Sequence, residues 1–423
     1  MKNRGEHDAY AVLKIADFRW FIMGRFFLTL AIQMQSVIVG WQVYEITHDA
    51  LFLGIIGLAE VIPFLVLALF AGHVADSFIR KRIILITNSL YVFCAAGLLF
   101  LSYQSFGTNG PGLITLYWVI ALTGVARAFF YPAQSAYMAQ IVPKELYSNS
   151  STWNSTIWHI AAVTGPALGG LIYGFAGIHA AYFIVVLFSV ISLALFASMH
   201  SKPLPEKGKN LGVIHSLVEG LQFVFRQQLL LGAMTLDMFA VLFGGAVALL
   251  PVFAAEVLHV GPQGLGILRA APAFGAVIMS FVLAYYPPVK KTGMKLFFGV
   301  AGFGLCMFVF AVSRNFYLSL GVLILSGVFD NISVVIRGTI MQLYTPDEMR
   351  GRVASVNSIF IGSSNELGSF ESGLAAKLLG LVPSVIFGSA MTLLVVGFTA
   401  RFAPRLRRLE LEIQKDKKVG LQN

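Results

Sequence analysis

Eight ionisable side chains lie well inside stretches of the chain that are otherwise apolar. A charge in hydrocarbon is costly unless it is paired or hydrated, so each of them is a candidate for function. A buried carboxyl group can carry a proton, because burial penalises its charged form. The candidates for proton coupling are Asp330, Glu366, Glu60 and Asp237, whereas Glu371 lies near the end of its stretch and is expected to be hydrated. The full set is Arg25, Glu60, Arg127, Asp237, Arg269, Asp330, Glu366 and Glu371.

Two pairs of these charges occupy matching positions of an internal repeat and have opposite signs. Arg127 corresponds to Asp330 at an offset of 203 residues, and Arg25 corresponds to Asp237 at an offset of 212 residues. An ion pair between two symmetric halves requires such a sign reversal, so both pairs are candidate gates. The alternative is that each charge binds a neighbouring backbone group or reaches the aqueous surface.

The apolar stretches are long enough to cross a membrane. Hydrophobic residues make up 57% of the chain and charged residues 12%, and a helix of about 20 apolar residues spans the hydrocarbon of a bilayer. The composition therefore predicts an all-α membrane protein with twelve transmembrane helices. They are expected at 20–42, 51–75, 83–103, 112–135, 153–176, 179–199, 229–255, 262–286, 294–313, 316–340, 354–376 and 379–402.

The repeat divides these helices into two sets of six. Gly165 returns as Gly368 at the offset of 203, and Glu45 to His48 return as Glu256 to His259 at 211. Two copies in parallel order predict two pseudo-symmetric six-helix bundles that face each other across a cavity. The expected division is an N-terminal bundle (1–200), a cytoplasmic linker with an amphipathic helix (201–228), a C-terminal bundle (229–402) and a basic cytoplasmic tail (403–423).

Basic residues alternate between the two sides of the predicted bundle. The connections after odd-numbered helices contain almost no Lys or Arg, apart from Arg314 and, at a boundary, Lys377, whereas the other side contains most of them. The positive-inside rule then places both termini in the cytoplasm. The net charge of +10 reflects this topology, so we do not expect nucleic acid as a partner. Cys94 and Cys306 fall inside apolar stretches, without the spacing of a metal site.

Two glycine-containing motifs resemble those of a known transporter family. The segment from Gly72 to Arg82, with Asp76 four residues after the glycine, resembles the loop signature of the major facilitator superfamily. There, Gly72 would permit close helix packing and Asp76 would pair with a basic group between the bundles. The run Gly165-Pro166-Ala167-Leu168-Gly169-Gly170 is similar to the antiporter motif of the superfamily's exporters.

The resemblance covers essentially the whole chain and is nearest to bacterial enterobactin exporters and drug–proton antiporters. Its further support is the segment 129–133 and the segment 364–373, and it departs from the family where Ile120 replaces a frequent arginine, whose role Arg127 could take. The resemblance implies a monomer in the bacterial inner membrane, driven by a proton gradient without a cofactor. Its implied partners are a small amphipathic substrate and the lipid bilayer.

Several polar and aromatic side chains are candidates for lining the substrate cavity. Amides can bind a substrate and rings can pack against it, although ordinary interhelical hydrogen bonds and core packing explain the same residues equally well. The candidates are Gln33, Gln35, Phe129, Phe239, Asn331 and Asn365.

These observations favour proton-coupled export of an amphipathic organic molecule, such as a siderophore or a drug, by alternating access. An uptake carrier or uniporter, or a lysolipid flippase, on the same fold remains an alternative. A membrane enzyme or receptor is not expected, because the chain has no catalytic constellation, phosphate-binding loop or sizeable soluble domain.

Overall fold

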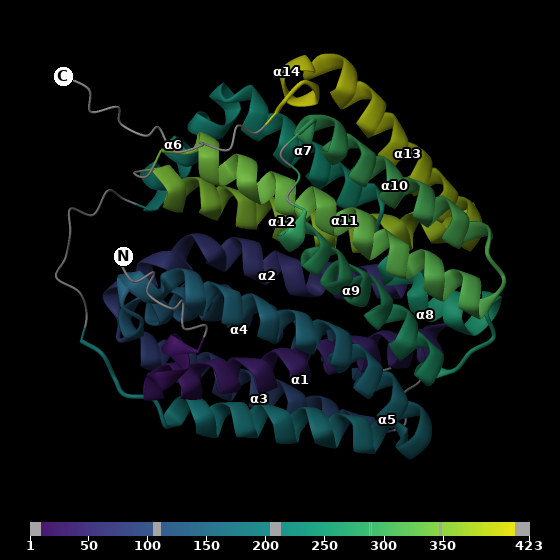
Figure 1. Ribbon diagram of the computed structural model, residues 1–423. Helices are drawn as coiled ribbons and strands as arrows, with labels where there is room; N and C mark the ends of the chain where they lie inside the picture. The colour runs from purple at the N-terminus through teal and green to yellow at the C-terminus, as the bar shows by residue number, and fades with distance from the viewer. Residues whose placement is uncertain are drawn as a thin grey trace, which may run out of the picture.

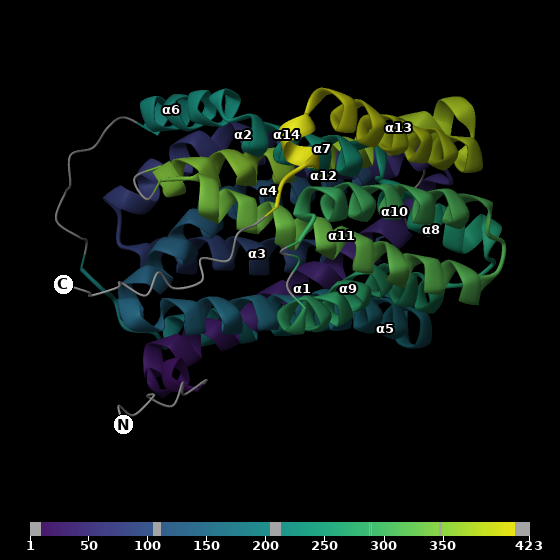
Figure 2. The same cartoon turned by 45° about the horizontal axis from the view of Figure 1, so that its top comes forward.

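The structure is a computed structural model that describes residues 10–104, 111–203, 213–286, 288, 290–346 and 349–410. It is helical, and the helices form two groups that lie beside each other (Figures 1 and 2). The first group comprises η1 (Ala11–Lys14), α1 (Ala16–Thr47), α2 (Ala50–Ser77), α3 (Arg80–Ser102), α4 (Pro111–Ile141), η2 (Lys144–Leu146) and α5 (Tyr147–Ala197).

The second group begins after a helix in the connection between the two groups, α6 (Val213–Arg226). We call the two groups the N half and the C half. The C half comprises α7 (Gln228–Phe243), η3 (Ala246–Leu249), α8 (Leu250–Val252), η4 (Phe253–Val257), α9 (Pro262–Tyr285), α10 (Thr292–Val312), α11 (Phe316–Tyr344), α12 (Arg350–Leu379), α13 (Leu381–Phe402) and α14 (Pro404–Arg407).

Helix α5 consists of two antiparallel helices joined at a single glycine. Gly177 has φ = 83° and interrupts the helical backbone. Before it, α5 runs parallel to α1, because Asn154 contacts Arg25 and Tyr173 contacts Glu45. After it the chain runs back along α1, so that its later residues contact progressively earlier residues of α1: Tyr182 bonds Gln42 and Ser192 bonds the Gly24 carbonyl.

Ten described helical segments are long and apolar enough to cross a membrane. The reversal in α5 divides one of these segments into two. Helix α12 is not among the ten, because Glu366, Glu371 and many small polar residues lower its hydropathy, yet it packs between α2 of the N half and α7 of the C half. The two helices within α5 lie at the predicted spans 153–176 and 179–199, and α12 lies at the predicted span 354–376.

The internal repeat extends to the backbone. His48, after α1, and His259, before α9, both adopt left-handed conformations, with φ of 49° and 51°. Gly177 and Gly380 both have positive φ, 83° and 93°, and each joins two consecutive helices. These four residues lie at the connections that have few basic side chains, and we call this end of the molecule the neutral end and the opposite one the basic end.

The two halves meet along two helix pairs, α5 with α9 and α2 with α12. A Cβ atom on Gly170 would lie 2.7 Å from Gly266 Cα, and one on Gly54 would lie 3.0 Å from Phe370 Cα. These helices approach backbone to backbone, which only small residues permit. All four residues lie in the part of their helices toward the neutral end, so the halves are closed against each other there.

The segments outside the two bundles pack at the basic end. Glu219 on α6 forms an ion pair with Arg352 on α12, and α6 leaves Val218, Leu221 and Phe225 exposed, as expected of a helix on a membrane surface. Of the predicted tail, the described part up to residue 410 packs on the C half, where Leu406 is fully buried.

Candidate functional site

An arginine in the N half is held by two carboxylates, one from each half. Arg127 Nη1 on α4 donates to Glu60 Oε1 on α2 at 2.8 Å and to Glu366 Oε1 on α12 at 2.9 Å. The side chains of Arg127, Glu60 and Glu366 are 22%, 27% and 19% exposed, so water screens their charges only partly. We call these three residues the clamp, because the contact with Glu366 joins the two halves.

Glycines one turn away bring the clamp helices together. Gly124 lies three residues before Arg127, and a Cβ atom there would lie 3.1 Å from Pro63 Cγ on α2 and would collide with the Glu60 carbonyl. Gly57 lies three residues before Glu60, and a Cβ atom there would lie 2.9 Å from the Glu366 carbonyl oxygen on α12. Residues three apart share a helix face. On both α2 and α4, the helix face that contains the closely packed glycine therefore also contains the charged residue of the clamp.

Aromatic rings complete the surroundings of the arginine. The guanidinium carbon of Arg127 lies 5.0 Å from the ring centroid of Phe64 and 5.8 Å from that of Tyr131. Such contacts stabilise a cation that has lost part of its hydration. The guanidinium is thus fixed between two rings and two carboxylates, and protonation of either carboxylate would remove one of its charged partners.

A second polar contact between the halves lies near the clamp. Arg269 Nη2 on α9 donates to Ser36 Oγ on α1 at 2.7 Å. Arg269 belongs to the C half and Ser36 to the N half, so this bond also spans the interface. The sequence identified Arg269 as an intramembrane charge but did not predict its partner.

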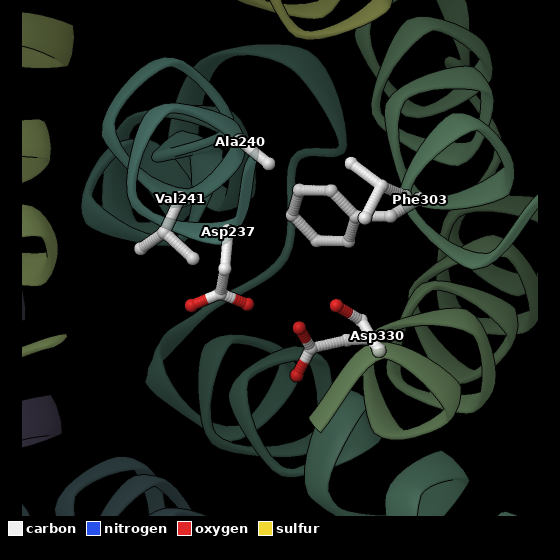
Figure 3. Close-up of a pocket in the computed structure, with 7 residues that line it drawn as sticks. Asp237, Ala240, Val241, Phe303 and Asp330 are labelled. Atoms are coloured by element: carbon white, nitrogen blue, oxygen red, sulfur yellow. The ribbon is translucent and has the colours of Figure 1, made fainter. Parts of the chain in front are cut away.

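The remaining acidic candidates, Asp237 and Asp330, lie together in the C half. Asp237 on α7 forms an ion pair with Arg337 on α11, and their side chains are only 8% and 7% exposed. Asp237, Asp330 and Ser333 line one pocket, whose walls include Val300 and Phe303 of α10 (Figure 3).

The two predicted ion pairs between symmetric positions are not formed in this conformation. Arg127 contacts the clamp carboxylates instead of Asp330. Arg25 donates to Asn154 within the N half, and Asp237 pairs with Arg337 within the C half. Arg25 and Asp237 each bind a side chain on another helix of their own half, which is neither the predicted pair nor the alternative of a backbone or surface contact. A pair between Arg127 and Asp330 stays a prediction for a conformation with a different interface.

Arg337 was missed in the sequence, although it lies within the predicted span 316–340. Arg337 could have been recognised as a candidate because it lies seven residues after Asp330. This spacing is two helical turns, so both residues lie on the same face of the helix. Its partner Asp237 is 100 residues away in the chain. The sequence alone therefore did not indicate that the two side chains would pair.

Two of the candidate cavity residues, Asn331 and Asn365, bond protein groups in this conformation. Asn331 donates to the Ala276 carbonyl oxygen at 2.6 Å and to Ser280 Oγ at 2.7 Å, which are helix-to-helix bonds within the C half. Asn365 donates to the Ile361 carbonyl oxygen of its own helix at 2.8 Å. The contacts of Asn331 are interhelical hydrogen bonds, as in the alternative interpretation, whereas the bond of Asn365 stays within its own helix.

The other cavity candidates are half-buried. Phe129 packs against the buried cluster at the basic end of the N half, and Phe239 stacks on Phe243 with ring centroids 6.3 Å apart. Gln33 and Gln35 lie two residues apart on α1, and Gln33 Cβ would be 2.6 Å from a Cβ atom on Gly165. Gln33 therefore lies at the contact between α1 and α5.

The glycines of the antiporter-like run lie at tight helix contacts. A Cβ atom on Gly169 would lie 3.1 Å from Met34 Cα on α1. A Cβ atom on Gly266 of α9 would lie 2.6 Å from the Pro166 carbonyl oxygen and 2.9 Å from Gly170 Cα. The run therefore packs α5 against α1 on one side and against the C half on the other.

The close packing expected at Gly72 is not formed in this conformation and stays a prediction. Among the described residues, no atom lies within 4 Å of a Cβ atom built on Gly72. Close packing of α2 occurs instead toward its neutral end, at Gly54 and Gly57. The side chain of Asp76 lies outside the described residues, so its proposed pairing stays a prediction.

Polar contacts at the neutral end also join the halves. Lys377 Nζ on α12 donates to Asp49 Oδ2 at 2.8 Å, and Tyr44 on α1 donates to Glu256 on η4. Partial burial raises the pKa of Asp49, but the hydrogen bonds from Lys377 and the Leu51 amide outweigh it and hold that pKa below its usual value. The sequence did not indicate these contacts, since such residues are common at helix ends.

The structure thus has two helical halves that are joined by close helix packing and by ion pairs between them. Comparison with protein families identifies it: the family model of the Major Facilitator Superfamily matches residues 21–369. The chain belongs to this superfamily. It is therefore a multi-pass membrane protein of a family of transporters, as its apolar helices and its two-half architecture also indicate.

Relatives among characterised proteins resemble it over nearly their whole lengths. The staphyloferrin A transporter of Staphylococcus aureus is 25% identical, covering 94% of this chain and 98% of that protein. The multidrug efflux pump Tap of Mycolicibacterium fortuitum is 24% identical, covering 88% and 91%. The enterobactin exporter EntS of Citrobacter koseri is 22% identical, covering 91% and 93%.

Solved structures confirm the fold. A POT family transporter in complex with 5-aminolevulinic acid superposes with a TM-score of 0.73 at 11% identity, covering 92% of this chain and 96% of that chain. A bacterial homologue of the iron transporter ferroportin superposes with a TM-score of 0.69 at 16% identity, covering 94% and 100%. At these identities the likeness concerns the fold alone.

Proposed function

We propose that this protein is a secondary active transporter that exports a small amphipathic organic molecule in exchange for protons. Support comes from relatives named as siderophore exporters or transporters and a drug efflux pump. The substrate class is accordingly siderophores or drugs. The membrane is the bacterial inner membrane, with the basic end and both termini in the cytoplasm, as the positive-inside rule requires.

The observation that carries the proposal is the contact between Arg127 and Glu366 across the two halves. Deprotonated Glu366 attracts Arg127 and holds the neutral end closed. A proton on Glu366 removes the ion pair and allows the halves to separate, so proton binding and conformation are linked. An empty, deprotonated carrier stays closed, which prevents cycles that would dissipate the gradient without moving substrate.

Among the four predicted proton carriers, Glu366 fits this role best. Glu60 and Arg127 both belong to the N half, so their contact does not depend on the separation of the halves. Asp237 is occupied by Arg337 within the C half. Asp330 lines the pocket of the C half and has no contact with Arg127 in this conformation.

Transport by purified protein in proteoliposomes tests the proposal. With siderophores, drugs and lysolipids as substrates, we expect a pH gradient to drive uphill movement of one class. Glu366→Gln is expected to abolish uphill movement but to preserve counterflow, because counterflow requires no net proton movement. Glu371→Gln is the matched control, since that carboxyl lies on the same helix and bonds only its neighbour Ser372 in the described structure.

The outcomes separate the alternatives. Movement of substrate only down its own gradient would indicate a uniporter. Uphill movement that ignores the pH gradient would indicate a carrier with another driving force. Movement of lysolipids alone would indicate a flippase. Normal proton-driven transport in Glu366→Gln would exclude the clamp from coupling.

A further inference from the structure

A group of basic side chains at the basic end of the C half is not used by the clamp. The segments 290–298 and 398–410 contain the start of α10, the end of α13 and α14, and their only acidic residue is Glu410. Their basic side chains are all exposed, and none bonds or pairs with another residue that the structure describes. We call this group the basic patch: Lys290, Lys291, Lys295, Arg401, Arg405, Arg407 and Arg408.

Packing of α14 on α10 brings the two segments together. Leu406 of α14 is fully buried, and the Gly293 amide at the start of α10 donates to the Leu409 carbonyl oxygen at 3.0 Å. Ala403, Leu406 and Leu409 are buried at every third position, so the arginines between them stay exposed. Basic residues from distant parts of the chain therefore share one surface.

The charges of α10 and α13 lie at the same height along the two helices. A Cβ atom on Gly304 of α10 would lie 3.1 Å from Thr392 Cγ2 of α13, and the two helices run antiparallel with the same rise per residue. Lys295 and Arg401 are equally far from this contact in opposite directions along the chain, and both lie toward the basic end. Lys295 therefore lies level with Arg401.

Exposed aromatic rings lie one turn below these charges. Phe298 follows Lys295 by three residues and Phe398 precedes Arg401 by three, so each ring shares a helix face with a charge. The two phenylalanines are 64% and 65% exposed, and α13 lies on the side of the C half away from the N half (Figure 1). A charged layer followed by an apolar layer matches the headgroups and the hydrocarbon of a bilayer.

The corresponding basic residues of the N half are bonded within the protein. Helix α3 and the second helix of α5 are the third and last helices of that half, as α10 and α13 are of the C half. Lys81 on α3 donates to the Ala197 carbonyl oxygen at 2.8 Å, and Lys202, after α5, pairs with Asp17 at 2.8 Å. The positive-inside rule does not predict this difference between the halves, so the unpaired charges of the C half call for a ligand.

We propose that the basic patch binds an anionic phospholipid, whose phosphate contacts Lys295 and Arg401 and whose hydrocarbon tails lie along Phe298 and Phe398. Lysine and arginine form charge-assisted hydrogen bonds with phosphate, and basic clusters beside transmembrane helices attract anionic headgroups. A soluble anion would leave the adjoining rings unused. The inference does not depend on the substrate, on the direction of transport or on the clamp.

Binding of phosphatidylglycerol to the detergent-purified protein tests the patch. Native mass spectrometry measures its affinity beside that of phosphatidylcholine with the same tails, which has no net charge. We expect phosphatidylglycerol to bind at least about tenfold more tightly. Inorganic phosphate at the same concentration should not displace it, because free phosphate makes no contact with the rings.

Neutralised variants locate the lipid. Lys295→Gln combined with Arg401→Gln should weaken phosphatidylglycerol binding about thirtyfold, since each basic residue near an anionic headgroup contributes a factor of about five. The affinity for phosphatidylcholine should not change. Arg405→Gln combined with Arg408→Gln should also weaken the binding, and it remains informative if the first variant does not fold.

The matched control removes the same charge elsewhere. Lys144 and Arg314 are exposed and lie outside the patch, so Lys144→Gln combined with Arg314→Gln should bind phosphatidylglycerol as the parent protein does.

Three results would overturn the proposal. Equal affinities for the two lipids would mean that the patch serves topology alone. An equal loss of binding in the control variant would mean that the overall charge attracts the lipid. Displacement by inorganic phosphate at the same concentration would mean that the patch binds a free anion and no lipid.

Discussion

Neutralising Glu366 should open the neutral end of the transporter, because it removes a charged contact between the halves. The Arg127–Glu366 contact is 2.9 Å long, and its side chains are 22% and 19% exposed. A charge-assisted hydrogen bond of this kind contributes about 1.5–3 kcal/mol. Since about 1.4 kcal/mol corresponds to a factor of ten, the equilibrium should shift by about ten- to a hundredfold.

The rest of the clamp decides where in this range the effect lies. In Glu366→Gln, Arg127 keeps its 2.8 Å contact with Glu60, so no unpaired guanidinium is left. We therefore expect a shift near the lower limit, about tenfold. Arg127→Ala leaves Glu60 and Glu366 without their shared cation, and its effect should be larger because an unpaired buried charge is costly.

Distances between spin labels at Phe175 and Tyr317 measure this shift. The two residues are 81% and 79% exposed and belong to opposite halves toward the neutral end. Cys94 and Cys306 are replaced by alanine to leave only the labelled thiols. Glu60→Gln is the matched control, since it removes an equally short contact of Arg127 that lies within the N half.

Glu366→Gln should populate longer distances, whereas Glu60→Gln should resemble the parent protein. If Glu366→Gln leaves the distances unchanged, or if both variants lengthen them equally, the clamp does not hold the halves together.

Three further predictions concern topology, packing and pH. Cysteine labelling at Lys81 should occur only from the cytoplasm and at Gly177 only from outside; the reverse pattern would contradict the positive-inside assignment. Gly170→Ala should favour an open neutral end and shorten the lifetime of the closed one, because its Cβ would meet the backbone of α9, whereas Gly321→Ala, with open space around it, should not. Spin-label distances distinguish the two. The pKa of Asp49 is held below its usual value, so its contribution to stability should persist above about pH 4 and disappear as the pH falls through the lowered pKa. Asp49→Asn should make the unfolding temperature less sensitive to acid, and an unchanged acid profile would refute this.

The helices and their division into halves could be predicted because they depend on local patterns. Apolar runs of membrane length and a repeat at 203 residues are visible in the sequence. The span 354–376 was the weakest of the predicted apolar runs, and its helix α12 is not among the ten candidate spans of the described residues. The repeat supports this span independently, because Gly165 and Gly170 correspond to Gly368 and Gly373.

The charged residues were also visible, but their partners were not. An arginine within an apolar run must find compensation, yet Arg127 lies 67 residues from Glu60 and 239 from Glu366. Symmetry suggested Asp330 as its partner, and the structure shows that packing at Gly57 and Gly124 brings other acids closer. The pairing depends on which conformation the interface adopts, and a single sequence contains no such preference.

The reversal of α5 at Gly177 has a mechanical consequence. A hinge requires several residues whose backbone angles can change, and a connection of one glycine does not supply them. The helices 147–176 and 178–197 must then move together as one lever. The first reaches the opposite half at Gly170, and the second exposes Phe183, Leu187 and Val190 toward the acyl chains. Each opening of the transporter therefore displaces lipid, and the thickness and lateral pressure of the surrounding bilayer contribute to the work of the transport cycle.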